Sequence, residues 1–190
     1  MADKKANKKI FLIPGWMDVV SRYGYASGLD IWLSGTFPKM KKHESCVVGH
    51  SLGANFVLVH CDAEKCEKII LVNPLLLKRS KLGWFVRWFK NTVFERDGFS
   101  LKRAETLMYF FSNLRKAFEL LRDDFGRILD DIPADKIIII RGKEDLFYCD
   151  EETAEFVKQK GIRLIEIEGI GHNWRGRRFN KIIDELVAEI

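Results

Sequence analysis

A serine between two glycines is the first place in the chain where residue types and spacing suggest chemistry. Residues 46–55 read Cys-Val-Val-Gly-His-Ser-Leu-Gly-Ala-Asn, which predicts a buried strand, a sharp turn at Ser51 and a helix start. On such a strained turn the hydroxyl stands clear of the backbone, and small residues are needed where Gly49 and Gly53 lie. The N–H of Leu52 would then lie at the N-terminus of a helix, where the unpaired amides and the helix dipole favour negative charge. The pattern indicates a nucleophile with half of an oxyanion hole, although a turn with a harmless serine fits it as well.

Asp145 and His172 could activate this serine. Both residues, like Ser51, follow a stretch that we predict as a strand, and open α/β sheets place their sites beyond the carboxyl ends of the strands. Serine is a poor nucleophile at its own pKa, so it needs an imidazole to take its proton and a carboxylate to orient that imidazole. We therefore expect His172 to be the base and Asp145 the orienting acid. The order Ser, Asp, His is the one expected when a serine occupies such a turn.

Other carboxylates and imidazoles compete for these two roles. Glu144 and Asp150 lie close to Asp145 in the sequence. We favour Asp145 because a turn three residues after Gly142 would bring its carboxylate back over the sheet. The other histidines, which we interpret as structural or surface residues, are His43 in a charged loop, His60 late in a helix and His50 beside the serine.

A second oxyanion donor is expected from the loop after the first strand, which contains Pro14-Gly15-Trp16. The amide of Trp16 would point at the same spot as that of Leu52. Removing one such donor typically costs a few kcal/mol in the transition state. Because the donor is a backbone amide, replacing the Trp16 side chain need not remove it. Taken alone, the Pro-Gly pair indicates an ordinary turn.

Strands and helices alternate along most of the chain. Short unbroken apolar runs predict parallel strands that are covered on both faces, and the segments between them have helical spacing. The predicted strands are Lys9–Ile13, Cys46–His50, Lys68–Val72, Lys136–Ile140 and Ile162–Ile167, and the predicted helices are Tyr23–Leu33, Leu52–Cys61, Gly83–Phe89, Leu101–Leu121, Glu151–Lys160 and 178–190. The alternation predicts an α/β fold with a mostly parallel sheet flanked by helices.

Residues 75–131 interrupt this alternation with long amphipathic helices and many aromatic side chains. An aromatic stripe at helical spacing is usually core. Here, however, the aromatic residues exceed what a few helices can bury against one another, which favours a lid over an apolar pocket. The residues that we expect to bind substrate are Trp84, Trp88, Phe110 and Phe111.

The composition is that of one globular domain. The chain has 190 residues, 47% of them apolar and 31% charged, so a single domain over 1–190 can bury a core without disulfides or metals. Its four cysteines show no metal-site spacing, and we interpret them as buried thiols in a reducing cytoplasm. No run approaches the ~20 apolar residues of a membrane span. We expect disorder at residues 1–7 and neither a metal nor an organic cofactor.

These motifs together resemble those of the α/β-hydrolase superfamily of serine hydrolases. The match covers most of the chain, which resembles a compact member with about five to six strands. Residues 75–131 occupy the place of the family's helical cap. The segments that carry the resemblance are Ile13-Pro14-Gly15-Trp16 for the oxyanion loop, Gly49 to Gly53 for the elbow, Arg141 to Asp145 for the acid turn and Gly169-Ile170-Gly171-His172 for the histidine loop.

The residues and the resemblance predict a carboxylesterase-type serine hydrolase whose substrate is a small ester with an apolar acyl or alcohol part. Thioesters, lactones, amides and peracid formation use the same triad, so these stay open, as does the oligomeric state. Some members of the superfamily act on acyl groups held by acidic acyl carrier protein, and a non-catalytic binding module is a further alternative. Nucleic acid is not expected, because no recognition motif accompanies the net charge of +5. The basic residues that fit the carrier alternative are Lys78, Arg79, Lys81, Arg87 and Lys90.

Overall fold

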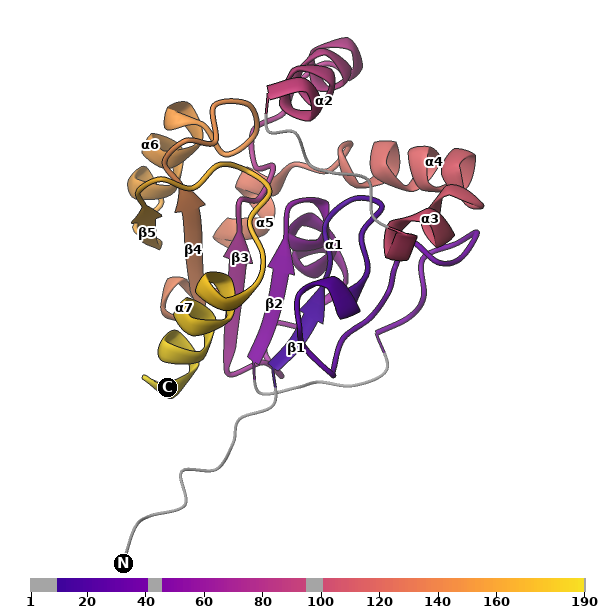
Figure 1. Cartoon of the computed structure of the whole chain (residues 1–190). Helices are drawn as coiled ribbons and strands as arrows, with labels where there is room; N and C mark the ends of the chain where they lie inside the picture. Colours follow the sequence, from indigo (N-terminus) through magenta and orange to yellow (C-terminus); the bar gives the residue numbers. More distant parts are fainter. Residues whose placement is uncertain (1–9, 41–45, 95–100, 190) are drawn as a thin grey trace, which may run out of the picture.

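Five parallel strands form the centre of the molecule (Figure 1). The computed structural model describes residues 10–40, 46–94 and 101–189, so the disorder predicted for residues 1–7 lies outside the described residues. The strands follow one another across the sheet in sequence order, and each pair of neighbours is parallel. This confirms the predicted parallel α/β sheet. The strands are β1 (Ile10–Ile13), β2 (Cys46–His50), β3 (Lys68–Val72), β4 (Ile137–Gly142) and β5 (Arg163–Ile167).

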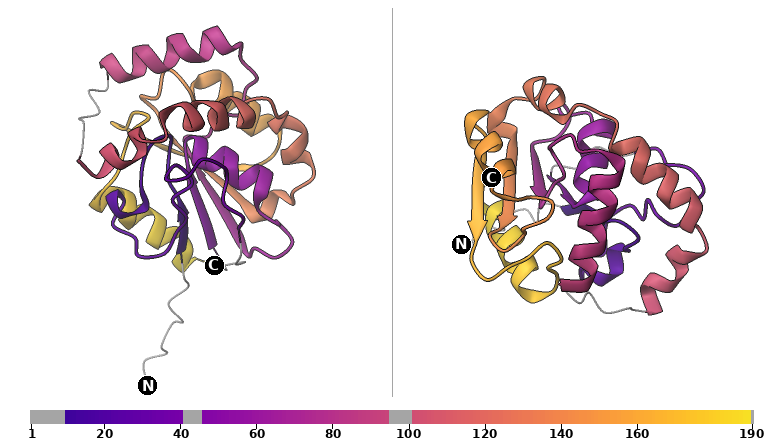
Figure 2. Two further views of the ribbon diagram at one scale, coloured as in Figure 1. Left: turned by 90° about the vertical axis from the view of Figure 1, so that its right-hand side faces the viewer. Right: turned by 90° about the horizontal axis from the view of Figure 1, so that it is seen from above.

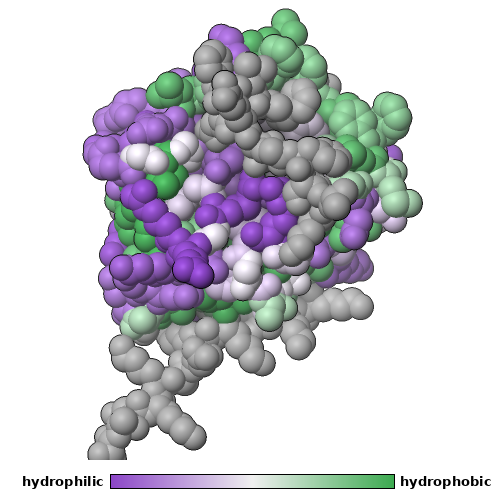
Figure 3. All heavy atoms as spheres, viewed as in Figure 1, coloured by the Kyte–Doolittle hydropathy of each residue, from purple (hydrophilic) through white to green (hydrophobic). Residues whose placement is uncertain are grey.

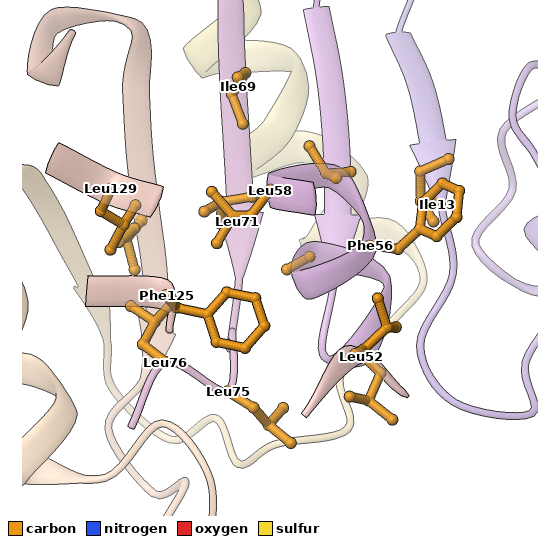
Figure 4. Packing of buried hydrophobic residues seen from close by; sticks show 14 of the residues in the cluster. Ile13, Leu52, Phe56, Leu58, Ile69, Leu71, Leu75, Leu76, Phe125 and Leu129 are labelled. Atoms are coloured by element: carbon orange, nitrogen blue, oxygen red, sulfur yellow. The ribbon is translucent and has the colours of Figure 1, made fainter. Parts of the chain in front are cut away.

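Helices cover both faces of this sheet. Right-handed crossovers between successive parallel strands place their helices on the same face, which here carries α1 (Leu52–His60), α5 (Phe125–Asp130) and α6 (Glu151–Gln159). Phe56 of α1 and Phe125 of α5 pack there against the strands (Figure 4). The other face is covered by α7 (Arg177–Ala188), whose buried residues share a cluster with strand residues. The helices therefore exclude water from both faces of the sheet, as the unbroken apolar strands require.

The helix predicted for Tyr23–Leu33 is wrong. The structure has only a short 3₁₀ helix, η1 (Val20–Arg22), and then an irregular segment along the free edge of β1. There the N–H of Leu12 donates to the carbonyl of Ser27 (3.2 Å), and the N–H of Leu29 donates to the carbonyl of Leu12 (2.9 Å). The segment gives up helical bonds because it satisfies the edge of the sheet, which would otherwise be open.

The described residues of the segment predicted as a cap, 75–94 and 101–131, form four helices. They are α2 (Lys81–Phe94), α3 (Leu101–Leu107), α4 (Phe110–Leu120) and α5. Seen from above, α2 crosses over the carboxyl ends of the strands, and α4 lies to one side of the sheet (Figure 2). The two helices are in contact, since the rings of Trp84 and Phe118 have centroids 5.7 Å apart. In the described part of the chain, no helix has the length and apolar character needed to cross a membrane.

The single helix predicted over Leu101–Leu121 is also wrong, because a turn between α3 and α4 interrupts it. At the break the Asn113 side chain donates to the carbonyl of Thr106 at 3.1 Å, and it also donates to the carbonyl of Trp32 at 3.0 Å. One turn later the buried amine of Lys116 donates to the carbonyls of Ile31 (2.5 Å) and Ser34 (2.8 Å). These bonds fix α4 to the loop that follows η1. The helix predicted for Gly83–Phe89 extends further at both ends, and α5 was not predicted.

Candidate active site

Ser51 occupies a strained turn between β2 and α1. Its φ of 53° lies in the left-handed region, which L-residues seldom adopt outside over-determined sites. The strand and the helix pass so closely that a Cβ on Gly49 would lie 2.5 Å from the Cα of Ala54. A Cβ on Gly53 would lie 2.4 Å from the carbonyl oxygens of Ile13 and Pro14. Both glycines are therefore required by close approach of the backbone, as the sequence pattern predicts.

The structure brings Ser51, His172 and Asp145 into one hydrogen-bonded chain. His172 Nδ1 lies 2.6 Å from Asp145 Oδ2, and His172 Nε2 lies 2.8 Å from Ser51 Oγ. Because an ionised carboxylate only accepts, Nδ1–H donates to Asp145 and Nε2 is left to accept from the serine hydroxyl. All three side chains are buried, with Ser51 the most accessible at 8% exposure. This is the arrangement in which an imidazole can take the serine proton.

Asp145 is held by the backbone of its own turn. Its carboxylate accepts from the N–H groups of Phe147 (3.2 Å), Tyr148 (3.0 Å) and Cys149 (3.1 Å). Burial alone would raise the pKa of Asp145, but the neighbouring His172 and the N–H donors of Tyr148 and Cys149 lower it below its ordinary value. The group is therefore a fixed negative charge beside the imidazole.

The loop predicted to supply an oxyanion donor lies against the serine turn. The Gly15 N–H donates to the Tyr23 hydroxyl (3.2 Å), and the Trp32 indole donates to the carbonyl of Pro14 (3.2 Å). Trp16 follows Gly15 in this loop. On the serine turn, which the loop contacts, Leu52 is the first residue of α1. The N–H at such a position has no partner inside its helix. The two predicted donors, the N–H groups of Trp16 and Leu52, thus lie on two backbone segments that are in contact.

His50 has a structural role that its neighbourhood in sequence did not reveal. Its Nε2–H donates to the carbonyl of His172 at 2.9 Å, so Nδ1 is free to accept from the Tyr23 hydroxyl at 2.7 Å. Burial, together with the neighbouring His172, lowers the pKa of His50 to about 3. His50 is therefore a neutral ring that links the loop of Gly15 to the loop of His172.

Asn73 is a second supporting residue that sequence reasoning missed. Its side-chain N–H groups donate to the carbonyls of Gly171 (3.0 Å) and His172 (2.8 Å), and its oxygen accepts from the Gly142 N–H (2.8 Å). Its φ of 46° aims the side chain across the ends of the strands. The one signal in the sequence was its place directly after β3, at the edge where a site is expected.

The competing acid and base candidates lie away from this chain of hydrogen bonds. Glu144 is exposed, although it adjoins Asp145. His60 is exposed at the end of α1, where its ring packs against Phe56 with centroids 4.4 Å apart. His43 lies outside the described residues. Of the two histidines in this group that the structure describes, His50 adjoins the site and His60 does not.

Asp150, the last competing acid, has other partners. Its carboxylate accepts from the Thr153 N–H (3.2 Å) at the start of α6 and contacts Arg79 (2.7 Å) and Arg87 (3.0 Å). Arg87 also donates to the carbonyl of Phe147 at 2.6 Å. Two of the basic residues considered for an acidic partner are thus committed to the acid turn, which they tie to α2.

An apolar pocket adjoins the site. Its wall residue Tyr148 has its ring 4.4 Å from that of His172, and its wall residue Trp84 has its ring 5.1 Å from that of Trp16. Charged side chains also line it, namely those of Lys78, Arg79, Arg87, Arg122 and Asp123. The apolar side chains that line it are Leu75, Leu77, Trp84, Phe118, Leu121, Phe125 and Tyr148.

The predicted substrate-binding residues are placed differently from one another. Trp84 is buried and lines this pocket. Phe111 is 84% exposed on the outside of α4, with its ring 5.6 Å from that of the half-buried Phe110. Trp88 belongs to α2, but its side chain lies outside the described part of the structure. Tyr148 was missed, although its place three residues after Asp145 was a usable signal.

This architecture is the α/β-hydrolase fold, as comparison with solved structures shows. The chain is similar to a carboxylesterase of the thaumarchaeon Nitrososphaera gargenis, with 13% identity, a TM-score of 0.63 and coverage of 95% of this chain and 89% of that one. An α/β hydrolase enzyme from a Medee basin deep-sea metagenome is similar with 16% identity, a TM-score of 0.59 and coverage of 100% and 91%. For the monoacylglycerol lipase of Paleococcus ferrophilus the values are 15%, 0.54, 95% and 93%. No protein-family model and no curated protein matches the sequence.

Proposed function

We propose that the protein is a serine hydrolase that cleaves carboxylic esters with an apolar acyl or alcohol part. The observation that carries this proposal is the buried chain of hydrogen bonds from Ser51 through His172 to Asp145, at 2.8 and 2.6 Å. A serine used only for structure would need neither a strained φ nor an imidazole whose other nitrogen is fixed by a carboxylate. The fold shared with a carboxylesterase and a lipase supports the same reaction class.

In the proposed reaction, Ser51 Oγ attacks the ester carbonyl while His172 Nε2 takes the serine proton. The N–H groups of Trp16 and Leu52 hold the negative oxygen of the tetrahedral intermediate. His172 then gives the proton to the leaving alcohol, and an acyl group stays on Ser51. Water, activated by the same nitrogen, releases the acid and restores the serine. Asp145 stays ionised and stabilises the imidazolium in both halves of the reaction.

The pocket supports an apolar substrate part. Its walls reach both the proposed base, through Tyr148, and the proposed oxyanion loop, through Trp84. An apolar chain bound there would leave its carbonyl near Ser51 without burying an unpaired polar group. We propose that α2 and α4, which supply Trp84 and Phe118, act as the cap of this pocket.

Replacing Ser51 with alanine tests the assignment. Ser51→Ala should lower hydrolysis of p-nitrophenyl esters by at least ~10⁴-fold, because the nucleophile is lost while the fold is kept. It should also abolish labelling by a fluorophosphonate. The matched control is Ser21→Ala, which removes an exposed hydroxyl from η1 and should behave as the wild-type protein. Turnover by Ser51→Ala at the wild-type rate would refute the proposal, and absence of turnover and labelling in the wild type would favour a binding module.

Acyl groups carried by acyl carrier protein are the second candidate, since Lys78 lines the pocket and Lys78 and Lys90 are both exposed. Arg79 and Arg87 are poor probes of this candidate because they bind Asp150 at the acid turn. Lys90→Glu, at an exposed residue outside the pocket lining, should weaken activity on a carrier-bound thioester only. Equal loss on a free p-nitrophenyl ester would speak against the carrier.

A further inference from the structure

Helix α2 has two different apolar faces. On the inner face Trp84 is buried, with its ring 5.1 Å from that of Trp16 and 5.7 Å from that of Phe118. Arg87 lies on the same side and donates to the carbonyl of Phe147 (2.6 Å). This face attaches the helix to the body of the protein. One apolar face is enough for a helix that only covers a pocket.

The outer face of α2 is apolar as well. Leu82 is 73% exposed, Phe85 50%, Val86 42% and Phe89 59%. Spacings of three and four residues place these side chains in one stripe, on the side of the helix opposite Trp84 and Arg87. Single exposed apolar residues are common on protein surfaces, but a stripe that includes Leu82, Val86 and Phe89 forms an exposed apolar patch.

A second apolar patch lies at the same end of the molecule. At the turn between α3 and α4, Leu107 is 45% exposed, and Met108 and Phe111 are each 84% exposed. In the space-filling view the hydrophobic colour gathers over α2 and over the beginning of α4 (Figure 3). The two patches therefore lie on the same side of the molecule, beyond the carboxyl ends of the strands.

Two exposed lysines adjoin the α2 stripe. Lys78 precedes the helix and Lys90 follows Phe89, and both side chains are exposed. Among the described residues no ion pair neutralises either lysine, whereas Arg87 is neutralised by Asp150. A second copy of the chain docked through this face in a two-fold dimer would set like charges against each other. A partner that has negative charges at its surface and an apolar interior would complement both, because its charges would face the lysines and its interior would take up the apolar stripe.

We propose that this face docks on an anionic phospholipid surface, with α2 lying in the plane of the interface. Leu82, Val86 and Phe89 would enter the boundary between headgroups and acyl chains, while Lys78 and Lys90 reach the phosphates. The inner face of α2 would keep its contact with Trp16, so the pocket beside the proposed site opens next to the lipid. The docking does not depend on catalysis by Ser51.

Co-sedimentation with sucrose-loaded vesicles tests the proposal. Wild-type protein should bind vesicles of phosphatidylcholine with phosphatidylglycerol and bind pure phosphatidylcholine more weakly. Leu82→Gln with Phe89→Gln should weaken partitioning at least ~10-fold, because two apolar side chains no longer leave water. Lys78→Gln with Lys90→Gln should weaken binding to the anionic vesicles roughly fivefold per lysine and leave binding to neutral vesicles unchanged. Ser51→Ala should bind as the wild type.

The matched control is Val59→Gln, which replaces a partly exposed apolar residue on α1, away from the two patches. It should bind vesicles as the wild type, and circular dichroism should show that all variants are folded. Absence of vesicle binding by the wild type would overturn the proposal, as would equal binding by the Leu82/Phe89 variant. A dimer that forms without vesicles and is lost in that variant would show that a second copy covers the face.

Discussion

His50 and His172 are linked by a hydrogen bond from the Nε2–H of His50 to the main-chain carbonyl of His172, at 2.9 Å. The bond joins the residue before the proposed nucleophile to the proposed base itself, although the two lie far apart in sequence. His50 also accepts from Tyr23, whose hydroxyl oxygen accepts from the Gly15 N–H. The serine turn, the histidine loop and the oxyanion loop are thus set relative to one another by two buried side chains.

We expect His50→Leu to lower kcat on p-nitrophenyl esters at least ~10-fold with little change in KM. The reason is that a misplaced base costs rate more than binding. His50→Gln should keep much of the wild-type kcat, because the glutamine amide can still donate to the carbonyl of His172. Steady-state kinetics of the two variants, with circular dichroism as a check on folding, measure this. If Leu and Gln reduce kcat equally, the hydrogen bond does not position the base.

His50 should also make the stability of the protein depend on pH. Its pKa is lowered by burial to about 3 in the folded state, against ~6.5 in the unfolded chain. Above pH 6.5 the ring is neutral in both states. Between the two values only the unfolded chain takes up the proton, so the free energy of unfolding should fall by up to ~1.4 kcal/mol per pH unit as the pH is lowered.

Urea unfolding at pH 7, 6, 5 and 4 measures this slope. His50→Gln should flatten it because the variant has no proton to take up at this position. His60→Gln is the matched control, since His60 lies outside the core and its removal should change the slope less. Equal slopes for the wild type and His50→Gln would mean that the ring is not kept neutral in the folded protein.

The strands and the site residues could be predicted because their signals are local. A buried parallel strand is an unbroken apolar run, and the tight turns after β2 and β4 need glycines at Gly49, Gly53 and Gly142. A Cβ on Gly142 would lie 2.3 Å from the carbonyl of Ile170. Since parallel strands end at one edge, the residues that follow them could be placed together before any contact was known.

The errors came from contacts between distant segments. Leu29 and Trp32 have helical spacing, but Leu29 pairs with Leu12 at the edge of β1 and the helix is lost. At the α3–α4 break the Asn113 side chain donates not only to the nearby carbonyl of Thr106 but also to that of Trp32, 81 residues earlier. His50 and Asn73 contact a loop about a hundred residues later, and no local pattern reveals such partners.

Gly53→Ala should destabilise the protein by about 1–3 kcal/mol and lower activity, because the new methyl group would meet backbone that cannot move away cheaply. Its position 2.4 Å from the carbonyl oxygens of Ile13 and Pro14 means that the loop carrying Trp16 must shift. Gly35→Ala is the matched control, since its Cβ would meet nothing within 4 Å. Urea unfolding and ester hydrolysis should separate the two variants. Equal stability and activity would show that the elbow tolerates a side chain there.

Asp145→Asn should lower kcat by about 10³–10⁴-fold. An amide cannot stabilise the imidazolium of His172, and its NH₂ group would face either the imidazole N–H together with the Cys149 N–H, or the N–H groups of Phe147 and Tyr148. The latter mismatch leaves buried donors unpaired, so we also expect a loss of about 1–3 kcal/mol of stability at neutral pH.

The same substitution should weaken the acid sensitivity of the fold. The pKa of Asp145 is lowered in the folded state, so its ionised form stabilises the protein above the unfolded pKa, and that stability is lost as the pH falls through the folded pKa. Asp145→Asn should therefore lose less stability than the wild type below pH ~4. Glu144→Gln removes the same charge from the exposed neighbouring residue and should leave kcat and stability unchanged. A greater loss of kcat in Glu144→Gln than in Asp145→Asn would assign the acid to Glu144 instead.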